Sequence, residues 1–266
     1  VDLALITLLY GGHALIVGVP GLAKTKLVET IGIVCGLETK RIQFTPDLMP
    51  ADITGSEVLE ESADHRRHFR FIRGPVFASL LMADEINRAS PRTQSALLQA
   101  MQEHHVTVSG QRHGVVREIL DVYVNYPDFE TEKRVLIATT TGQSQNVTPV
   151  LDAQKLIHAQ RFIQLMPIGD HIVNRIVNLV QAARPDTAHP SQSAHIAWGP
   201  GPRAGQALML ATRARALLQG RFTPSEDDVM ALAKPILKHR MALTYRARAE
   251  GETVDHFIDR LTAARP

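Results

Sequence analysis

The sequence predicts an α/β domain built on a parallel sheet, followed by an all-helical domain. In the first half of the 266 residues, short apolar runs alternate with stretches of helical periodicity. That alternation is typical of a parallel sheet covered by helices on both faces. After Asp128 only helical periodicity recurs. We therefore expect the α/β domain over residues 1–127 and the helical domain over residues 128–266.

Strands and helices are expected in alternation along the first domain. The expected strands, each a short apolar run, are residues 13–17, 41–44, 80–83 and 120–124, with a hairpin at residues 58–71. The expected helices, each with apolar residues recurring on one face, are residues 1–10, 24–35 and 90–102. The last of these begins at Ser90 and Pro91, which are typical of an N-cap and a first helical residue.

The second domain is expected to consist of helices over residues 131–140, 152–164, 169–183, 202–218 and 228–243. Thr223 and Glu226 have the spacing of a capping box with Pro224 at the first helical position, which predicts Thr223 as the N-cap of the last helix. Residues 182–202, rich in proline, serine, glycine and histidine, are expected to form the longest loop.

The composition is that of a globular protein with a sizeable core. Hydrophobic residues make up 44% and charged residues 21%, and the net charge of +2, from 29 basic and 27 acidic residues, gives no sign of nucleic-acid binding. The single cysteine, Cys35, excludes an internal disulfide and a cysteine-rich metal site and fits a reducing, cytoplasmic location. No apolar run approaches the roughly 18 residues of a membrane span. Because Val1 lies inside a helical run, we expect the natural start to lie upstream.

A loop with the sequence GVPGLAKT, residues 18–25, lies between the first expected strand and the helix that follows. This is the context of a Walker A loop, whose backbone N–H groups surround the phosphates while a lysine, here Lys24, reaches the β- and γ-phosphates. Thr25 would place its hydroxyl on Mg²⁺. The alternative, an ordinary turn, is disfavoured by the combination of strand, loop, Lys-Thr pair and helix. The residues expected to bind nucleotide are Gly18, Val19, Pro20, Gly21, Leu22, Ala23, Lys24, Thr25 and Lys26.

A second signal is the apolar run of residues 80–83, which is followed by Asp84 and Glu85. This is the form of a Walker B strand, in which Asp84 would hold the Mg²⁺ shell and Glu85 would orient and polarise the attacking water. Two acidic residues at a strand end are common on any surface, so the segment alone favours a solvated strand end. Paired with the loop at Lys24, it favours a catalytic pair.

Further along, the sequence contains QFTPDLMPADITG (43–55), GPVF (74–77), ADEINRA (83–89), QSALLQAMQE (94–103), NYP (125–127), GPGPRA (199–204) and HRMAL (239–243). Together with the loop, these segments resemble the MoxR family of AAA+ ATPases over nearly the whole chain. Strict Walker A loops have glycine at the position of Ala23, and the family shares this replacement. Alanine fits there if its φ is not positive.

The resemblance implies a P-loop AAA+ ATPase with a parallel-sheet core and a helical lid, which binds ATP and Mg²⁺ and assembles as a homo-oligomer, a hexameric ring. Family members act as chaperone-like factors that mature or activate protein complexes, including by metal or cofactor insertion, and pair with a von Willebrand A-type partner. The match further implies that Arg203 is the sensor 2 arginine, which contacts a nucleotide phosphate and joins Lys24 and Glu85 in catalysis. Residues 58–71 would be the hairpin insertion of this AAA+ branch, a candidate contact for the substrate or for the pore of the ring.

Two parts of an AAA+ site have no room in this sequence. The resemblance implies a sensor 1 strand and an arginine finger ahead of the NYP segment, yet only a few residues separate His113 from Leu120. Residues 139–141 and Arg161 follow the NYP segment, so the resemblance places both in lid helices. The alternative, that residues 139–141 are sensor 1, is disfavoured. We hypothesise that residues between His113 and Leu120 are missing from the sequence, because a parallel sheet without that strand would leave buried edges unpaired.

Other functions use similar loops and acidic pairs. An AAA+ nucleic-acid motor or loader is the main alternative, and the near-neutral charge disfavours it. A phosphotransferase is the second, disfavoured because Asp84 and Glu85 favour water over an acceptor hydroxyl. The histidine pairs His65/His68 and His104/His105 are expected to be solvated, since neither has a third ligand at helical spacing.

Overall fold

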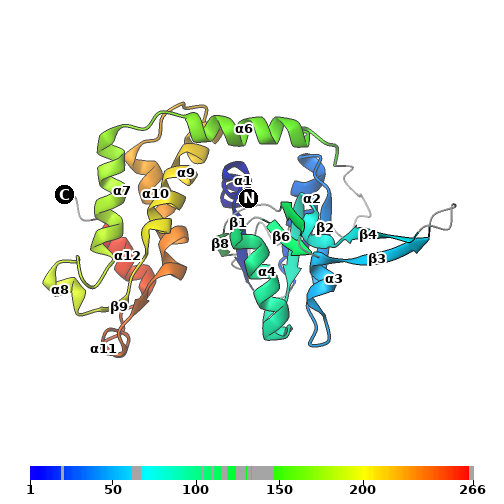
Figure 1. Ribbon diagram of the computed structural model, residues 1–266. Helices are drawn as coiled ribbons and strands as arrows, with labels where there is room; N and C mark the ends of the chain where they lie inside the picture. The colour runs from blue at the N-terminus through cyan, green and yellow to red at the C-terminus, as the bar shows by residue number, and fades with distance from the viewer. Residues whose placement is uncertain are drawn as a thin grey trace. The chain divides into compact units, whose positions relative to one another are not determined.

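The computed structural model describes residues 1–18, 21–61, 67–103, 105–108, 111–114, 119–123, 130, 133 and 147–263 (Figure 1). The chain divides into two compact units. Unit 1 comprises Val1–Val17, Ile119–Tyr123 and Ile157–Pro266, and unit 2 comprises Gly18–Glu118 and Val124–Leu156. Each unit is therefore assembled from segments that are far apart in the sequence.

Unit 2 contains the predicted alternation of strands and helices. Its elements are α2 (Lys24–Val34), β2 (Thr39–Gln43), α3 (Pro50–Thr54), β3 (Gly55–Glu61), β4 (Arg67–Arg73), η1 (Pro75–Phe77), β5 (Leu80–Asp84), η2 (Ile86–Arg88), α4 (Pro91–Glu103), β6 (His105–Val108) and β7 (Gln111–Gly114). β2 and β5 pair in parallel, from Thr39 opposite Leu80 to Gln43 opposite Asp84. Both strands therefore end at the same edge, with Gln43 beside the acidic pair.

The hairpin of β3 and β4 is longer than predicted. It pairs antiparallel from Gly55 opposite Arg73 to Glu61 opposite Arg67 and extends away from the rest of unit 2 (Figure 1). Gly55 has φ +90°, and a Cβ at this position would lie 2.2 Å from the carbonyl oxygen of Ile72. The start of the hairpin therefore requires glycine. β6 and β7 form a second antiparallel pair, which the sequence analysis did not predict.

The core of unit 2 is small and lies around β2, α3 and α4. Phe44 and Ile53 are fully buried, and Leu97 of α4 is 2% exposed. The predicted start of α4 is confirmed, since the backbone N–H of Thr93 donates to Oγ of Ser90 at 3.3 Å. This packing fixes α4 against the segment that follows β2.

Unit 1 consists mainly of helices, with one parallel strand pair. Its elements are α1 (Asp2–Tyr10), β1 (His13–Val17), β8 (Ile119–Tyr123), α6 (Ala153–Leu165, entering unit 1 at Ile157), α7 (Asp170–Ala182), α8 (Pro190–Ser193), β9 (Ile196–Trp198), α9 (Pro202–Leu218), α10 (Glu226–Leu237), η3 (Lys238–Arg240), β10 (Ala242–Leu243), α11 (Tyr245–Ala249) and α12 (Val254–Ala263). β1 pairs directly with β8, from His13 opposite Ile119 to Val17 opposite Tyr123.

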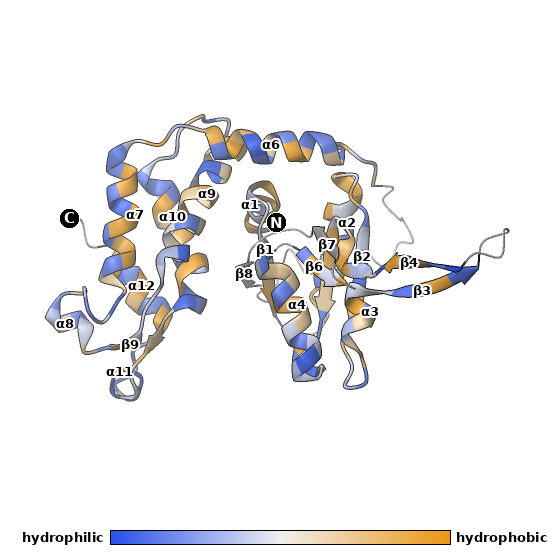
Figure 2. Cartoon of the chain, in the orientation of Figure 1, coloured by the Kyte–Doolittle hydropathy of each residue, from blue (hydrophilic) through white to orange (hydrophobic). Residues whose placement is uncertain are grey.

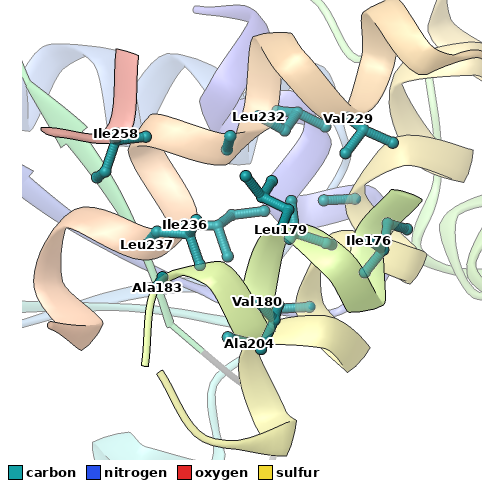
Figure 3. Close-up of a cluster of buried hydrophobic side chains, with 14 of the residues drawn as sticks. Ile176, Leu179, Val180, Ala183, Ala204, Val229, Leu232, Ile236, Leu237 and Ile258 are labelled. Carbon is teal, nitrogen blue, oxygen red and sulfur yellow. The ribbon is translucent and has the colours of Figure 1, made fainter. Parts of the chain in front are cut away.

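The helices of unit 1 share one hydrophobic core. Ile176 of α7, Leu208 of α9, Ile236 of α10 and Ile258 of α12 are each 1% exposed or less (Figure 3 labels three of them). Hydrophobic and hydrophilic residues alternate along α7 and α10 (Figure 2), which is the amphipathic pattern from which these helices were predicted. Truncating one such buried side chain to alanine costs about 2–5 kcal/mol of stability.

α10 differs from its prediction at both ends. Its N-cap is Ser225, not Thr223, and the capping box closes on Asp228, whose Oδ2 accepts a 2.8 Å hydrogen bond from the Ser225 N–H. The helix ends at Leu237 instead of residue 243. Pro235 removes one N–H donor from the last turn, and residues 242–243 pair with β9 instead.

Other helices of unit 1 agree with the sequence analysis to different degrees. α7 and α9 are confirmed, whereas α11 and α12 were not predicted. The loop predicted at residues 182–202 contains the short helix α8 and the strand β9. The helix predicted at residues 131–140 lies outside the described residues, apart from Lys133. None of the helices in the described part of the chain is long and apolar enough to cross a membrane.

Candidate functional site

The loop that leads into α2 is open where a ligand would approach. Val19 and Pro20 lie outside the described residues. Gly21 has φ +85°, and among the described residues no atom beyond its chain neighbours lies within 4 Å of the position a Cβ would take. Leu22 is half-buried, whereas Gly21 and Ala23 are exposed. The described part of the loop is therefore an exposed turn, with no side chain filling the space beside Gly21.

Ala23 has a left-handed backbone, with φ 52° and ψ 27°. The condition under which alanine would fit this position without strain is therefore not met. A left-handed conformation costs a residue with a Cβ about 1–2 kcal/mol. Among the described residues, the non-glycine residues with positive φ are Ala23 and Glu85, whose φ is 56°. Backbone strain of this kind concentrates at functional sites, and here it falls on one residue of each predicted motif.

The N-terminus of α2 is suited to an anion. Ala23 makes no side-chain cap, and the first hydrogen bond within the helix runs from the Leu27 N–H to the Ala23 carbonyl oxygen at 2.9 Å. The N–H groups of the first turn therefore have no acceptor within the helix, and the helix dipole adds partial positive charge there. Phosphate groups bind at such helix starts.

Lys24 folds back across this loop. Its Nζ donates a 2.9 Å hydrogen bond to the carbonyl oxygen of Gly18, which places the ammonium charge at the start of the loop. Thr25 is half-buried beside it, and Lys26 is exposed. The contacts of Lys24 and Thr25 with phosphate and Mg²⁺ stay predictions, and Lys26 extends into solvent.

The acidic pair at the end of β5 is held by three polar side chains that the sequence analysis missed. Oδ2 of Asp84 accepts a 2.7 Å hydrogen bond from Nη2 of Arg41. Oε2 of Glu85 accepts hydrogen bonds from Nε2 of Gln43 at 2.6 Å and from Nη1 of Arg88 at 2.8 Å. The signal that could have indicated Arg41 and Gln43 is their spacing, since alternate residues of a strand share one face.

The residues present fit a nucleotide-bound Mg²⁺. The Thr25 hydroxyl and the Asp84 carboxylate are hard oxygen donors, the kind that Mg²⁺ prefers. The described residues contain no group of three or more His, Cys, Asp or Glu side chains that could hold a metal by themselves. Mg²⁺ at phosphate sites needs no such cage, because one or two protein oxygens, phosphates and waters complete its shell. His65 and His104, members of the two histidine pairs, lie outside the described residues.

Arg203 belongs to unit 1, whereas the loop and the acidic pair belong to unit 2. It is exposed in the first turn of α9, after the N-cap Gly201 and Pro202. A cation at this end of a helix is slightly disfavoured by the dipole, which favours a role beyond solvation. Arg161 lies in α6, as predicted, and residues 139–141 and 115–118 lie outside the described residues.

The chain is similar in sequence and in structure to known proteins. The sequence matches the profile of the ATPase family associated with various cellular activities (AAA) over residues 13–132 and that of the AAA lid domain over residues 190–261. It is 34% identical to the uncharacterized protein YeaC of Bacillus subtilis, covering 98% of this chain and 87% of the relative. It is also 34% identical to the chaperone MoxR1 of Mycobacterium tuberculosis, covering 98% of this chain and 76% of the relative. A crystal structure of a candidate ATPase from Cytophaga hutchinsonii superposes with a TM-score of 0.88 at 28% identity, covering 100% of this chain and 88% of that chain.

Proposed function

Because the chain belongs to the MoxR family of AAA+ ATPases, we propose that residues 18–26 and the pair Asp84 and Glu85 form its ATP site. We further propose that ATP hydrolysis there drives chaperone-like maturation or activation of a client protein complex. One observation supports the site above all others. The two strained non-glycine residues of the described chain, Ala23 and Glu85, fall in the two motifs that an ATPase needs.

In this proposal the first turn of α2 binds the phosphates. The N–H groups after Ala23 donate to phosphate oxygens, and Lys24 exchanges the Gly18 carbonyl oxygen for the β- and γ-phosphates. The exchange is favourable because a hydrogen bond between ions is stronger than one to a neutral carbonyl. Loss of the Lys24 charge therefore weakens binding directly.

Glu85 is the residue proposed to orient and polarise the attacking water. Gln43 and Arg88 both donate to its Oε2 and so fix the direction of the carboxylate. Among the described residues, no side chain or backbone group donates to its Oε1, and this is the oxygen we assign to the water. When bound through Thr25 and Asp84, Mg²⁺ would neutralise charge that develops on the phosphates.

The wider assignments rest on family membership. We propose a nucleotide-binding core over residues 1–127 and a lid over residues 128–266, in which Arg203 contacts a phosphate. The AAA and lid matches at residues 13–132 and 190–261 support this division. A hexameric ring, a von Willebrand A-type partner and a cytoplasmic location complete the proposal.

We also propose that the sensor 1 strand and the arginine finger are missing from the sequence between His113 and Leu120. Alignments to YeaC and MoxR1 run over 289 and 293 residues, more than the 266 of this chain, so the relatives contain residues that this chain lacks. This length difference supports the proposal without locating the gap. If the chain is continuous there, we expect ATP binding through Lys24 with little hydrolysis.

The test of the site is the affinity for ATP of Lys24→Ala, measured by calorimetry with Mg²⁺ present. We expect tight binding to be lost, because the ammonium charge contacts the phosphates directly. Lys40→Ala is the matched control, since Lys40 is half exposed on β2 and lies 3.4 Å from Glu38. Equal affinity in the wild type and Lys24→Ala would overturn the assignment.

A further inference from the structure

Arg41 and Gln43 connect the two acidic residues of the site through a chain of hydrogen bonds. The guanidinium of Arg41 donates to Oδ2 of Asp84 at 2.7 Å and to Oε1 of Gln43 at 3.3 Å. The amide of Gln43 donates in turn to Glu85 at 2.6 Å. The amide oxygen therefore faces the cation and the amide nitrogen faces the carboxylate, so each end of Gln43 meets a group of the matching polarity.

The register of the sheet builds this arrangement. Gln43 lies opposite Asp84 in the parallel pair of β2 and β5, and Arg41 lies two residues earlier on the same face of β2. Lys40 carries the same charge as its neighbour Arg41, but it points to the other face of β2, where it pairs with Glu38. One face of β2 thus carries the two side chains that donate hydrogen bonds to the acidic pair.

We propose that Arg41 is a positioning residue that acts as the internal counter-ion of Asp84 and competes with Mg²⁺ for its carboxylate. The proposal rests on the proposed function, because it takes Asp84 as the Mg²⁺ carboxylate. Oδ2 of Asp84 already accepts from a guanidinium, so a divalent cation at that oxygen must displace or repel Arg41. Arg41 therefore raises the Mg²⁺ concentration at which nucleotide is bound together with the metal. Gln43 accepts a hydrogen bond from Arg41 and donates one to Glu85, so it connects the position of Arg41 to that of Glu85.

A purely structural role for Arg41 makes a different prediction. Its side chain is 50% exposed and that of Asp84 is 32% exposed, so the ion pair contributes little to folding. A structural role would appear in the melting temperature and leave the dependence on Mg²⁺ unchanged. A role in holding phosphate would weaken nucleotide binding without Mg²⁺ as well.

The experiment measures binding of fluorescently labelled ADP by anisotropy while Mg²⁺ is titrated, and again in EDTA. For Arg41→Gln we expect the Mg²⁺ midpoint to fall roughly two- to fivefold, the range expected for a partly exposed ion pair, with affinity in EDTA unchanged. Arg41→Lys should restore part of the wild-type midpoint because it restores the charge. Lys40→Gln, which removes the same charge from the opposite face of β2, should match the wild type.

Two results would overturn the inference. An Mg²⁺ midpoint that does not move in Arg41→Gln would show that the cation does not compete at Asp84. Weaker ADP binding by Arg41→Gln in EDTA would assign Arg41 to the phosphates. Failure of the proposed function is distinguishable, because the wild type would then bind ADP no better than Lys24→Ala. Melting curves of each variant verify that it is folded.

Discussion

Arg221 holds Asp228 through both carboxylate oxygens, with Nη2 2.7 Å from Oδ1 and Nη1 2.9 Å from Oδ2. The Asp228 side chain is fully buried, and Arg215 pairs with it as well. The same carboxylate accepts from the Ser225 N–H and so caps α10. One buried charge therefore joins the end of α9, the following turn and the start of α10.

Asp228→Asn is expected to destabilise the protein by about 3 kcal/mol, because it leaves two arginines beside a neutral group and weakens the cap. Urea unfolding followed by circular dichroism measures the change. Asp227→Asn is the control, since the neighbouring Asp227 is exposed. Equal stability of the two variants would contradict the importance of the buried charge.

The contribution of Asp228 should depend on pH. Burial alone would raise the pKa of Asp228, but hydrogen bonds from Arg221, from the Ser225 N–H and from Arg215 outweigh burial and hold the pKa below its ordinary value. The stabilisation is therefore fully present above the unfolded pKa of about 3.9 and is lost as the pH falls through the folded pKa. The difference in unfolding free energy between the wild type and Asp228→Asn should be constant from about pH 5 to 7 and shrink below about pH 4. A difference that grows toward acid would be the opposite of this expectation.

Ala23→Gly should stabilise unit 2 by up to about 1 kcal/mol. Glycine removes the cost of a left-handed backbone at φ 52° but loses more entropy on folding, so the gain is smaller than the strain. Thermal unfolding checks it against Ala51→Gly, an exposed helical position in α3 where glycine should destabilise by roughly 0.5–1 kcal/mol. Destabilisation by both substitutions would mean that Ala23 is not strained.

Much of the fold follows from local patterns, and the differences arise from contacts that are distant in sequence. Ser90 identifies the start of α4 because a cap depends on neighbouring residues only. The predicted end of α10 is wrong because residues 242–243 pair with β9 instead of continuing the helix, and nothing in the local sequence indicates that pairing.

The candidate site divides in the same way. Motif spacing predicts Lys24, Asp84 and Glu85 as site residues, whereas Arg41 is found only through the parallel register of β2 and β5. The left-handed backbone of Ala23 is likewise a property of the folded loop, which residue type alone does not reveal. Whether the predicted residues bind nucleotide stays a prediction until it is measured.

The last prediction concerns assembly of the proposed ring. If each ATP site is completed by a neighbouring subunit, ATP binding and ring formation stabilise each other, and the ring should persist for as long as ATP does. Glu85→Gln should prolong it, because glutamine keeps an oxygen that Gln43 and Arg88 can donate to but lacks the charge that polarises water. Sedimentation in saturating ATP is expected to show a mass several times that of the monomer for Glu85→Gln, a wild-type ring that decays as ATP is consumed, and a monomer for Lys24→Ala. A Glu85→Gln protein that stays monomeric at saturating ATP would refute the ring.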